Sequence, residues 1–312
     1  MGEITKVKTA NHEEWKALRS KYIGGSDAAA VVGLNPYASA FSLWAEKTGK
    51  IPGFEGNLAT EVGTYLEEFV AQKFAQETGK KVRKCNQSFL NSQYPFAIAN
   101  IDREIVGEDA GLEIKTTDTL NLTKFKGGEY PANYYVQMMH YMAMTGKQRW
   151  YLAVLIGNKE FKWFILERDE AEIEALMTAE AEFWEHVKKN VPPEPDGTES
   201  TDKTLKYMYE YSDGENIADL FGYASDLDRY ISIGKQIKAL EQERNKAANR
   251  VKAFMAEAAS GECERYYVSW KSGIRRTFDA DRFAADNPDI DLSDYYNESI
   301  TRAFRVTERK GA

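Results

Sequence analysis

The sequence predicts an α/β fold, in which a mixed β-sheet is flanked by helices and followed by a C-terminal helical extension. Strand-like runs recur at 81–90, 94–101, 111–117, 150–156 and 159–166. Helical periodicity and capping residues predict helices at 11–22, 63–79, 131–145 and 169–190. Strands and helices interleaved along one chain are typical of a sheet covered by helices.

Length and composition are those of a globular protein with a sizeable core. The chain has 312 residues, of which 43% are hydrophobic and 29% charged. No apolar run approaches the roughly 18 residues of a membrane span and no signal-peptide-like stretch opens the chain, so we expect a cytoplasmic protein without membrane contact. Cys85 and Cys263 are isolated and only three histidines occur, so no zinc site is expected. The net charge of −8 argues against a generic nucleic-acid coat but is compatible with a local basic groove.

Two acidic residues are expected to meet at one end of the sheet. Asp102 ends a short apolar run, and a second run with alternating side chains begins nine residues later, at Gly111. Period-two alternation places Leu112 and Ile114 on one face and Glu113 and Lys115 on the other. If the runs 94–101 and 111–117 pair as a hairpin, the two carboxylates come together.

Two carboxylates and a nearby ammonium have the chemistry of metal-assisted phosphodiester hydrolysis. Carboxylate oxygens and water are the ligands that Mg²⁺ prefers. A bound ion lowers the pKa of its water, and Lys115 would orient or deprotonate that water. The alternative is a salt-bridged strand face exposed to solvent, and this stretch alone does not decide between the two.

A second candidate site lies near the N-terminus. Gly24-Gly25-Ser26-Asp27 precedes a helix of small residues, where backbone N–H groups are able to approach a phosphate. Arg19, seven residues earlier, would add a bidentate phosphate contact. The alternative role for Ser26 is that of a simple helix N-cap.

Two further pairs of polar residues lie on predicted helices. Glu67 and Glu68 fall in the first turns of the helix 63–79, where acidic side chains are favourable even when merely solvated. Gln137 and Tyr141 are four residues apart on the helix 131–145 and therefore share a face.

A proline-rich segment at 192–197 divides the chain into two predicted domains, 1–197 and 198–312. The second domain contains a predicted long helix near 224–259 with an apolar seam at heptad spacing. That seam is compatible with a coiled coil and equally with a helix packed on its own domain.

A small hairpin is predicted after the long helix, between 265–270 and 274–278. Aromatic and basic side chains are mixed along it, at Tyr266, Tyr267, Trp270, Lys271, Arg275 and Arg276. Nucleic-acid surfaces have this composition, and so do ordinary mixed strands.

Taken together in chain order, these motifs resemble the YqaJ-type viral recombinase family, relatives of phage lambda exonuclease within the PD-(D/E)xK nucleases. The matching pieces are Arg19 with Gly24-Gly25-Ser26-Asp27, Asn35-Pro36-Tyr37, Gly63-x3-Glu67, Asp102, Glu113-x-Lys115 and Gln137-x3-Tyr141. The resemblance covers about residues 10–195 closely and implies a restriction-endonuclease-like core.

The resemblance also implies a role for each residue of the metal site. The divalent ions would be held by Asp102, Glu113 and the backbone carbonyl of Ile114. The resemblance implies two ions per site, which are Mg²⁺, with Mn²⁺ as a substitute. Lys115 would position the attacking water. Glu67 would complete the site from its helix.

The remaining motifs are implied to support the site and bind DNA. Glu68 replaces Glu67 if the register is shifted by one residue. Gln137 and Tyr141 would support the catalytic residues and touch DNA. Arg19 and Ser26 would hold the terminal 5′-phosphate.

The implied function is a Mg²⁺-dependent exonuclease that digests linear double-stranded DNA from 5′ to 3′. Its product would be a 3′ single strand for an annealing protein in phage-type recombination, and it would act as a homo-oligomer, such as a ring trimer, in the bacterial cytoplasm. The alternatives are a structure-specific or single-strand nuclease with the same residues, and a non-enzymatic DNA-binding recombination factor. One departure from the family is Arg103, which follows the first acid where relatives often have glycine and is expected to alter the turn.

Overall fold

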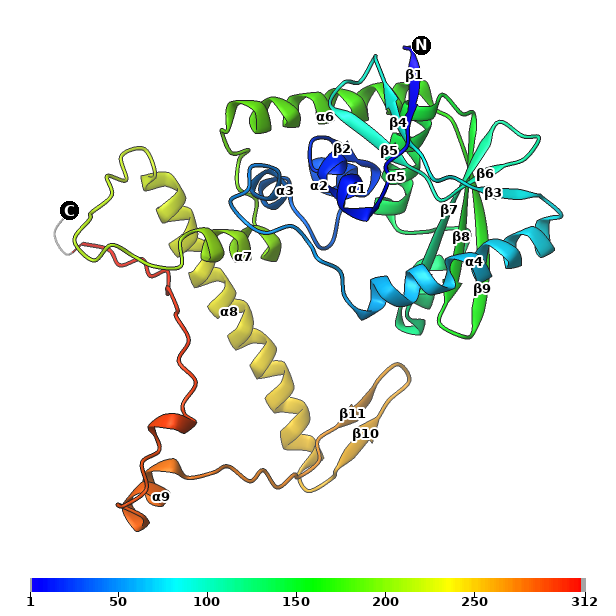
Figure 1. Ribbon diagram of the computed structural model, residues 1–312. Coiled ribbons are helices and arrows are strands. Elements are labelled where there is room, and N and C mark those ends of the chain that lie inside the picture. The colour runs from blue at the N-terminus through cyan, green and yellow to red at the C-terminus, as the bar shows by residue number, and fades with distance from the viewer. Residues whose placement is uncertain (1, 310–312) are drawn as a thin grey trace. The chain divides into compact units, whose positions relative to one another are not determined.

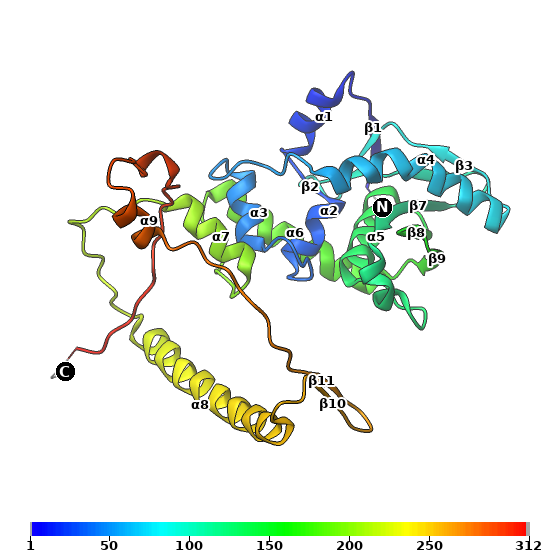
Figure 2. The same ribbon diagram turned by 90° about the horizontal axis from the view of Figure 1, so that it is seen from below.

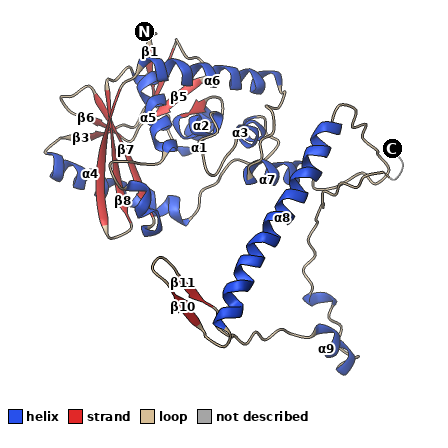
Figure 3. Ribbon diagram, turned by 180° about the vertical axis from the view of Figure 1, so that it is seen from behind, coloured by secondary structure: helices blue, strands red, loops and turns tan. Residues whose placement is uncertain are grey.

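The computed structural model describes residues 2–309, which form two compact units, and the chain passes from one to the other between Tyr209 and Glu210. Figure 1 shows the course of the chain and the labels of its elements. The strands gather mainly in the first unit, and the second unit has one short hairpin (Figure 3).

The first unit is built on a five-stranded sheet of mixed direction. Its strand order is β3 (Val82–Lys84), β6 (Arg103–Ile105), β7 (Ala110–Thr117), β8 (Arg149–Ile156) and β9 (Glu160–Glu167). β7 and β8 are parallel, and all other neighbours are antiparallel. A parallel pair needs a crossover connection, and α5 (Ala132–Thr145) lies in it.

A smaller four-stranded sheet contributes the rest of the β structure. Its order is β1 (Ile4–Val7), β4 (Ser88–Asn91), β5 (Ala97–Asn100) and β2 (Ile23–Gly24), with β2 and β5 parallel. The chain leaves this sheet at the end of β5 and enters the larger sheet at β6, and Asp102 lies between the two strands.

Helices cover both faces of the larger sheet. The α-helices of this unit are α1 (His12–Arg19), α2 (Gly25–Val31), α3 (Ala40–Lys47), α4 (Leu58–Thr78), α5, α6 (Glu170–Lys189) and α7 (Glu199–Met208), of which α4 and α5 contact the larger sheet. Figure 2 shows α4 and α5 on opposite sides of β7 and β8. Capping fixes the ends of α4, because Asn57 accepts a hydrogen bond from Thr60 N–H at the start and Gly79 adopts φ +70° at the end. These mixed sheets flanked by helices confirm the predicted α/β fold class.

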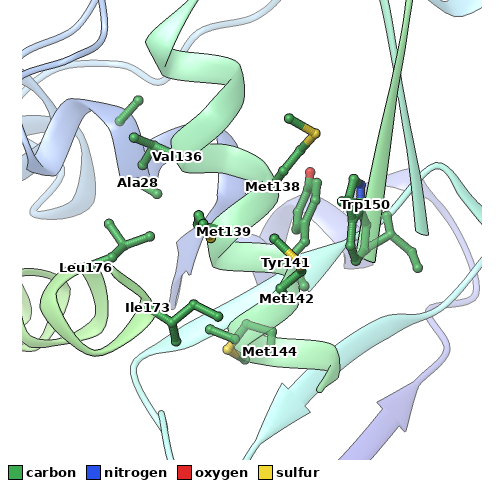
Figure 4. Packing of buried hydrophobic residues seen from close by; sticks show 14 of the residues in the cluster. Ala28, Val136, Met138, Met139, Tyr141, Met142, Met144, Trp150, Ile173 and Leu176 are labelled. Atoms are coloured by element: carbon green, nitrogen blue, oxygen red, sulfur yellow. The ribbon is translucent and has the colours of Figure 1, made fainter. Parts of the chain in front are cut away.

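The main core lies beside α5, whose apolar face packs on the sheet, α2 and α6. Figure 4 shows Tyr141 beside Trp150, with their ring centroids 5.3 Å apart. Met138 and Met142 fill the neighbouring space and are fully buried. A second core on the other side of the sheet joins Leu112 and Ile114 to residues of α4. The alternation predicted for β7 is therefore correct, because Leu112 and Ile114 share one face.

The predicted hairpin between 94–101 and 111–117 is wrong. β5 pairs with β4 and β2 in the smaller sheet, whereas β7 takes β6 as its antiparallel neighbour. The reason is that Asp102 interrupts the strand: it lies in a bend where the chain changes sheets. The residue is still delivered to the edge of β7, by a different connection.

The second unit contains a long helix, as predicted, but a different hairpin. α8 (Ala224–Met255) is followed by β10 (Ser260–Glu262), β11 (Tyr267–Ser269), α9 (Ala280–Asp286) and a 3-10 helix, η2 (Ser293–Tyr295). The predicted hairpin between 265–270 and 274–278 is wrong, because β10 pairs with β11. Cys263 and Tyr266 exchange backbone hydrogen bonds and close the turn, which begins eight residues before the predicted turn at Lys271-Ser272-Gly273.

The first unit extends beyond the predicted domain boundary at residue 197. α7 packs on α3, and Thr201 Oγ1 donates to Ser39 Oγ at 2.8 Å. Ser200 Oγ donates to Ser42 Oγ at 2.9 Å. The proline-rich segment 192–197 is therefore a loop within this unit, and the division falls after α7.

The apolar seam of α8 is largely exposed to solvent. Tyr230 packs against Phe304, with ring centroids 5.5 Å apart. The other large seam residues are exposed, namely Ile233, Ile237, Leu240, Val251 and Phe254. Within residues 2–309, none of the helices has both the length and the apolar character needed to cross a membrane.

Candidate active site

Asp102, Glu113 and Lys115 come together at the junction of the two sheets. Asp102 Oδ2 accepts a hydrogen bond from the backbone N–H of Ile114 at 2.8 Å, which ties the bend to the middle of β7. Glu113 is 2% exposed, and Lys115 Nζ lies 2.6 Å from its Oε1. The ammonium also lies over the ring of Tyr134, 5.3 Å from its centroid. The solvent-exposed salt-bridge interpretation therefore fails for Glu113, which is buried.

The two carboxylates repel each other in a poorly solvated place. Burial raises the pKa of Asp102 well above its ordinary value, and the Glu113 charge raises it further; Lys115 and the Ile114 N–H oppose this shift without cancelling it. Burial lowers the pKa of Lys115, but the Glu113 and Asp102 charges prevail, so its pKa is raised and it stays protonated at neutral pH. One ammonium thus faces two carboxyl groups, and it can balance the charge of only one of them.

The residues present fit a divalent cation. Glu113 Oε2 is buried and has no hydrogen-bond partner in the described part of the chain. A buried oxygen without a partner is costly, and a hard cation would satisfy it. Among residues 2–309, no three histidine, cysteine, aspartate or glutamate side chains form a ready-made cage. An ion at Asp102 and Glu113 would therefore take further ligands from the backbone, such as the Ile114 carbonyl, and from water.

The face shared by Gln137 and Tyr141 points at this pair. Gln137 Nε2 donates to Glu113 Oε1 at 2.8 Å and to Tyr141 Oη at 2.7 Å, so both amide hydrogens are used. These bonds fix the orientation of the Glu113 carboxylate. Burial raises the pKa of Tyr141 well above its ordinary value, with Glu113 and Asp102 adding to the effect, so the phenol stays neutral.

Glu67 is near the carboxylate pair but is bonded to an arginine. The guanidinium of Arg103, 2% exposed, forms an ion pair with Glu67 and another with Glu68 at 3.1 Å. Lys84 lies 3.9 Å from Glu67. The charge of Glu67 contributes to the raised pKa of Asp102. The side chain of Glu67 is 24% exposed, whereas that of Glu68 is 66% exposed. Glu67 is thus the better placed of the two candidates.

Arg19 and Ser26 also lie together. Arg19 Nη2 donates to Ser26 Oγ, and the Arg19 guanidinium lies over the Trp15 ring, 5.4 Å from its centroid. Ser26 is not the helix N-cap, because α2 begins at Gly25 and Gly24 holds the cap position. The hydroxyl is therefore turned toward the arginine.

A buried ion-pair network holds this arginine. Asp27 Oδ1 lies 3.5 Å from Arg19 Nη2, and Asp27 Oδ2 lies 2.8 Å from Lys47 Nζ. Burial raises the pKa of Asp27, but the Lys47 and Arg19 charges outweigh it and hold that pKa below its ordinary value. The side chain of Lys47 is only 4% exposed. Sequence reasoning missed Lys47, because no local pattern on α3 signals a partner on α2.

Gly25 connects the two groups of residues. A Cβ on Gly25 would lie 2.4 Å from Tyr141 Cε1, so only glycine lets α2 pack this closely on α5. Tyr141 in turn contacts Gln137, which holds Glu113. The arginine–serine pair thereby adjoins the carboxylate site.

The sequence and fold agree with one family. The model of the YqaJ-like viral recombinase domain matches residues 14–148. The uncharacterised protein YqaJ of Bacillus subtilis is 35% identical over 310 residues, which span 98% of this chain and 97% of the relative. The chain belongs to the YqaJ-like viral recombinase family. The resemblance drawn from the motifs is confirmed, and the relationship extends through the C-terminal unit.

Solved structures resemble part of this chain. The crystal structure of LHK-Exo in complex with dAMP has a TM-score of 0.50 and 24% sequence identity, covering 57% of this chain and 94% of that one. A second structure of this alkaline exonuclease, from Laribacter hongkongensis, has a TM-score of 0.49 and 23% identity, covering 57% and 94%. The likeness to the dAMP complex supports the fold alone, and the restriction-endonuclease-like core is confirmed.

Replacing Asp102 by asparagine tests the electrostatic description of the site. Because the pKa of Asp102 is raised on folding, its ionised form destabilises the fold at neutral pH, and this cost disappears below its ordinary pKa. Asp102→Asn keeps the acceptor for Ile114 and removes the repulsion. In EDTA at pH 7 its thermal midpoint should rise, by about 2–4 °C for each kcal/mol relieved.

Divalent ions should stabilise the wild type but not the Asp102→Asn variant. Mg²⁺ or Mn²⁺ should raise the midpoint of the wild type and leave that of Asp102→Asn unchanged. The matched control is Asp109→Asn, an exposed acid that should change neither value. A lower midpoint for Asp102→Asn in EDTA, or a metal response that survives in it, would contradict this description.

Proposed function

We propose that the protein is a metal-dependent exonuclease acting on linear double-stranded DNA, with Mg²⁺ as its ion and Mn²⁺ as a substitute. The observation that carries the proposal is the Glu113 carboxylate, buried beside Asp102 with one oxygen unpartnered and Lys115 2.6 Å from the other. Membership in a viral recombinase family supports it, as does a fold shared with a protein named as an alkaline exonuclease.

The chain's own residues divide the chemistry between them. Asp102 and Glu113, with the Ile114 carbonyl, would hold the ion, which when bound supplies charge for the scissile phosphate and a more acidic water. Lys115, protonated because of its two carboxylate neighbours, would orient the attacking water by donating a hydrogen bond. Gln137 keeps the Glu113 carboxylate in place while charge develops nearby.

We further propose that digestion runs from 5′ to 3′. Arg19 and Ser26 would bind a terminal 5′-phosphate, with Arg19 held by Asp27 and Trp15. Phosphate contacts carry no base information, so cleavage should be independent of sequence and strongly dependent on salt. The product would be a 3′ single strand for an annealing protein in phage-type recombination.

The assembly and place of action follow from the same proposal. We propose a homo-oligomer, such as a ring trimer, that surrounds the duplex and acts in the cytoplasm of a bacterial host. The second unit, beginning at Glu210, would contact DNA or another subunit.

The direct test is digestion of a linear duplex labelled at either strand end, with Mg²⁺ or EDTA. Wild-type protein should release nucleotides from the 5′ end only when Mg²⁺ is present. Lys115→Ala should lose about 10²-fold or more of this rate, because the attacking water loses its donor. Lys159→Ala, an exposed lysine at the β8–β9 turn, is the matched control and should remain active.

Other outcomes would select the alternatives. Release only from single-stranded or branched substrates would favour the structure-specific or single-strand nuclease. DNA binding without Mg²⁺-dependent release would favour the non-enzymatic recombination factor and overturn the proposal.

Arg19→Ala should separate phosphate recognition from catalysis. A charge-assisted hydrogen bond to phosphate is worth about 1.5–3 kcal/mol, so digestion of 5′-phosphorylated ends should fall about tenfold or more. Ends with a 5′-hydroxyl should be digested by the variant and the wild type at similar rates. Lys16→Ala, an exposed change on the same helix, serves as the control. Equal losses on both kinds of end would remove Arg19 from the phosphate pocket.

A further inference from the structure

Arg103 places a permanent positive charge inside the candidate active site. Its side chain is 2% exposed, and its guanidinium contacts Glu67, Glu68 and the carbonyl oxygen of Asp102, the last at 2.9 Å. A guanidinium does not deprotonate in proteins, and a buried charge is costly unless it is paired. The site therefore contains a fixed cation next to its first acid.

The strand pairing sets the direction in which this side chain points. Arg103 is opposite Leu112 of β7, and Leu112 packs with Val70 and Phe74 of α4. Residues opposite each other in paired strands share a face, so the guanidinium lies on the α4 side of the sheet. β3 pairs on the other edge of β6, where Lys84 is opposite Arg103. The position of the arginine is thus fixed from both neighbouring strands.

The two sides of Asp102 differ in how their acids are balanced. On one side Glu113 has an unpartnered buried oxygen, which a divalent ion would satisfy. On the other side Glu67 already has the guanidinium as its partner. A divalent ion at Glu67 would have to break a partly buried ion pair and sit close to the buried guanidinium, a like charge, which is unfavourable.

We propose that the guanidinium of Arg103 replaces a second divalent ion on the Glu67 side, so that the protein binds one divalent ion tightly instead of two. This inference rests on the proposed metal-dependent function. It revises the expectation of two ions per site, and it makes Arg103 a positioning residue that holds Glu67. A merely structural arginine, which ties β6 to α4, would leave the number of bound ions unaffected.

The test counts Mn²⁺ ions bound to the full chain in the absence of DNA, by calorimetric titration and by the electron paramagnetic resonance signal of free Mn²⁺. Wild type should bind one ion tightly. Arg103→Gln should bind a second ion as well. The Kd of this second ion should be about tenfold or more lower than in the wild type, because a like charge is removed. Arg103→Lys keeps the charge and should remain at one.

Matched controls locate the effect at this arginine. Arg83→Gln removes an exposed arginine from the neighbouring strand, where it pairs with Glu104 at 2.6 Å, and should leave one ion. Adding Glu67→Gln to Arg103→Gln should return the count from two to one, because the ligand for the second ion is removed.

The outcomes are separable. Two tight ions in the wild type, or one ion in a folded Arg103→Gln, would overturn the inference while leaving the proposed function intact. If Arg103→Gln does not fold, Glu67→Gln alone decides: an unchanged count of one supports the inference, and loss of an ion overturns it. A wild type that binds no Mn²⁺ would overturn the proposed function itself.

Discussion

The candidate active site is built around two carboxylates, a buried one on Glu113 and a partly buried one on Asp102, which share the ammonium of Lys115. Such a pair is unfavourable unless something else supplies positive charge or hydrogen bonds. Its surroundings provide both in part: the Ile114 N–H binds one carboxylate and the Gln137 amide binds the other. One oxygen of Glu113 is left over. The repulsion between the carboxylates and the unpartnered oxygen make the site suited to a divalent cation.

The same constraint recurs around the pair. Two buried charges near it are compensated by partners from other elements: Arg103 by α4, and Asp27 by α1 and α3. These ion pairs fix the arginines in place before any ligand arrives. Preorganised charges act in a site without the cost of rearrangement when substrate binds. Gly25 adds close packing, because it lets the start of α2, which carries Ser26, approach the ring of Tyr141.

Local patterns predicted much of this structure. Period-two alternation placed Glu113 correctly, and the four-residue spacing of Gln137 and Tyr141 put both on the face that meets it. Partners far apart in sequence were not predictable in this way. The strand opposite β7 was assigned wrongly because the bend at Asp102 moves the chain to another sheet, which no periodicity reveals. The ion pairs of Lys47 and Arg103 depend on helix packing and strand register, and so required the structure.

A crystal structure grown with Mn²⁺, in which anomalous scattering locates the ions, would show directly whether these carboxylates bind a cation. We expect a peak within bonding distance of both Asp102 and Glu113, with Lys115 alongside. If Mn²⁺ binds elsewhere and the two carboxylates contact only Lys115, Gln137 and the Ile114 N–H, then this pair is not a cation site.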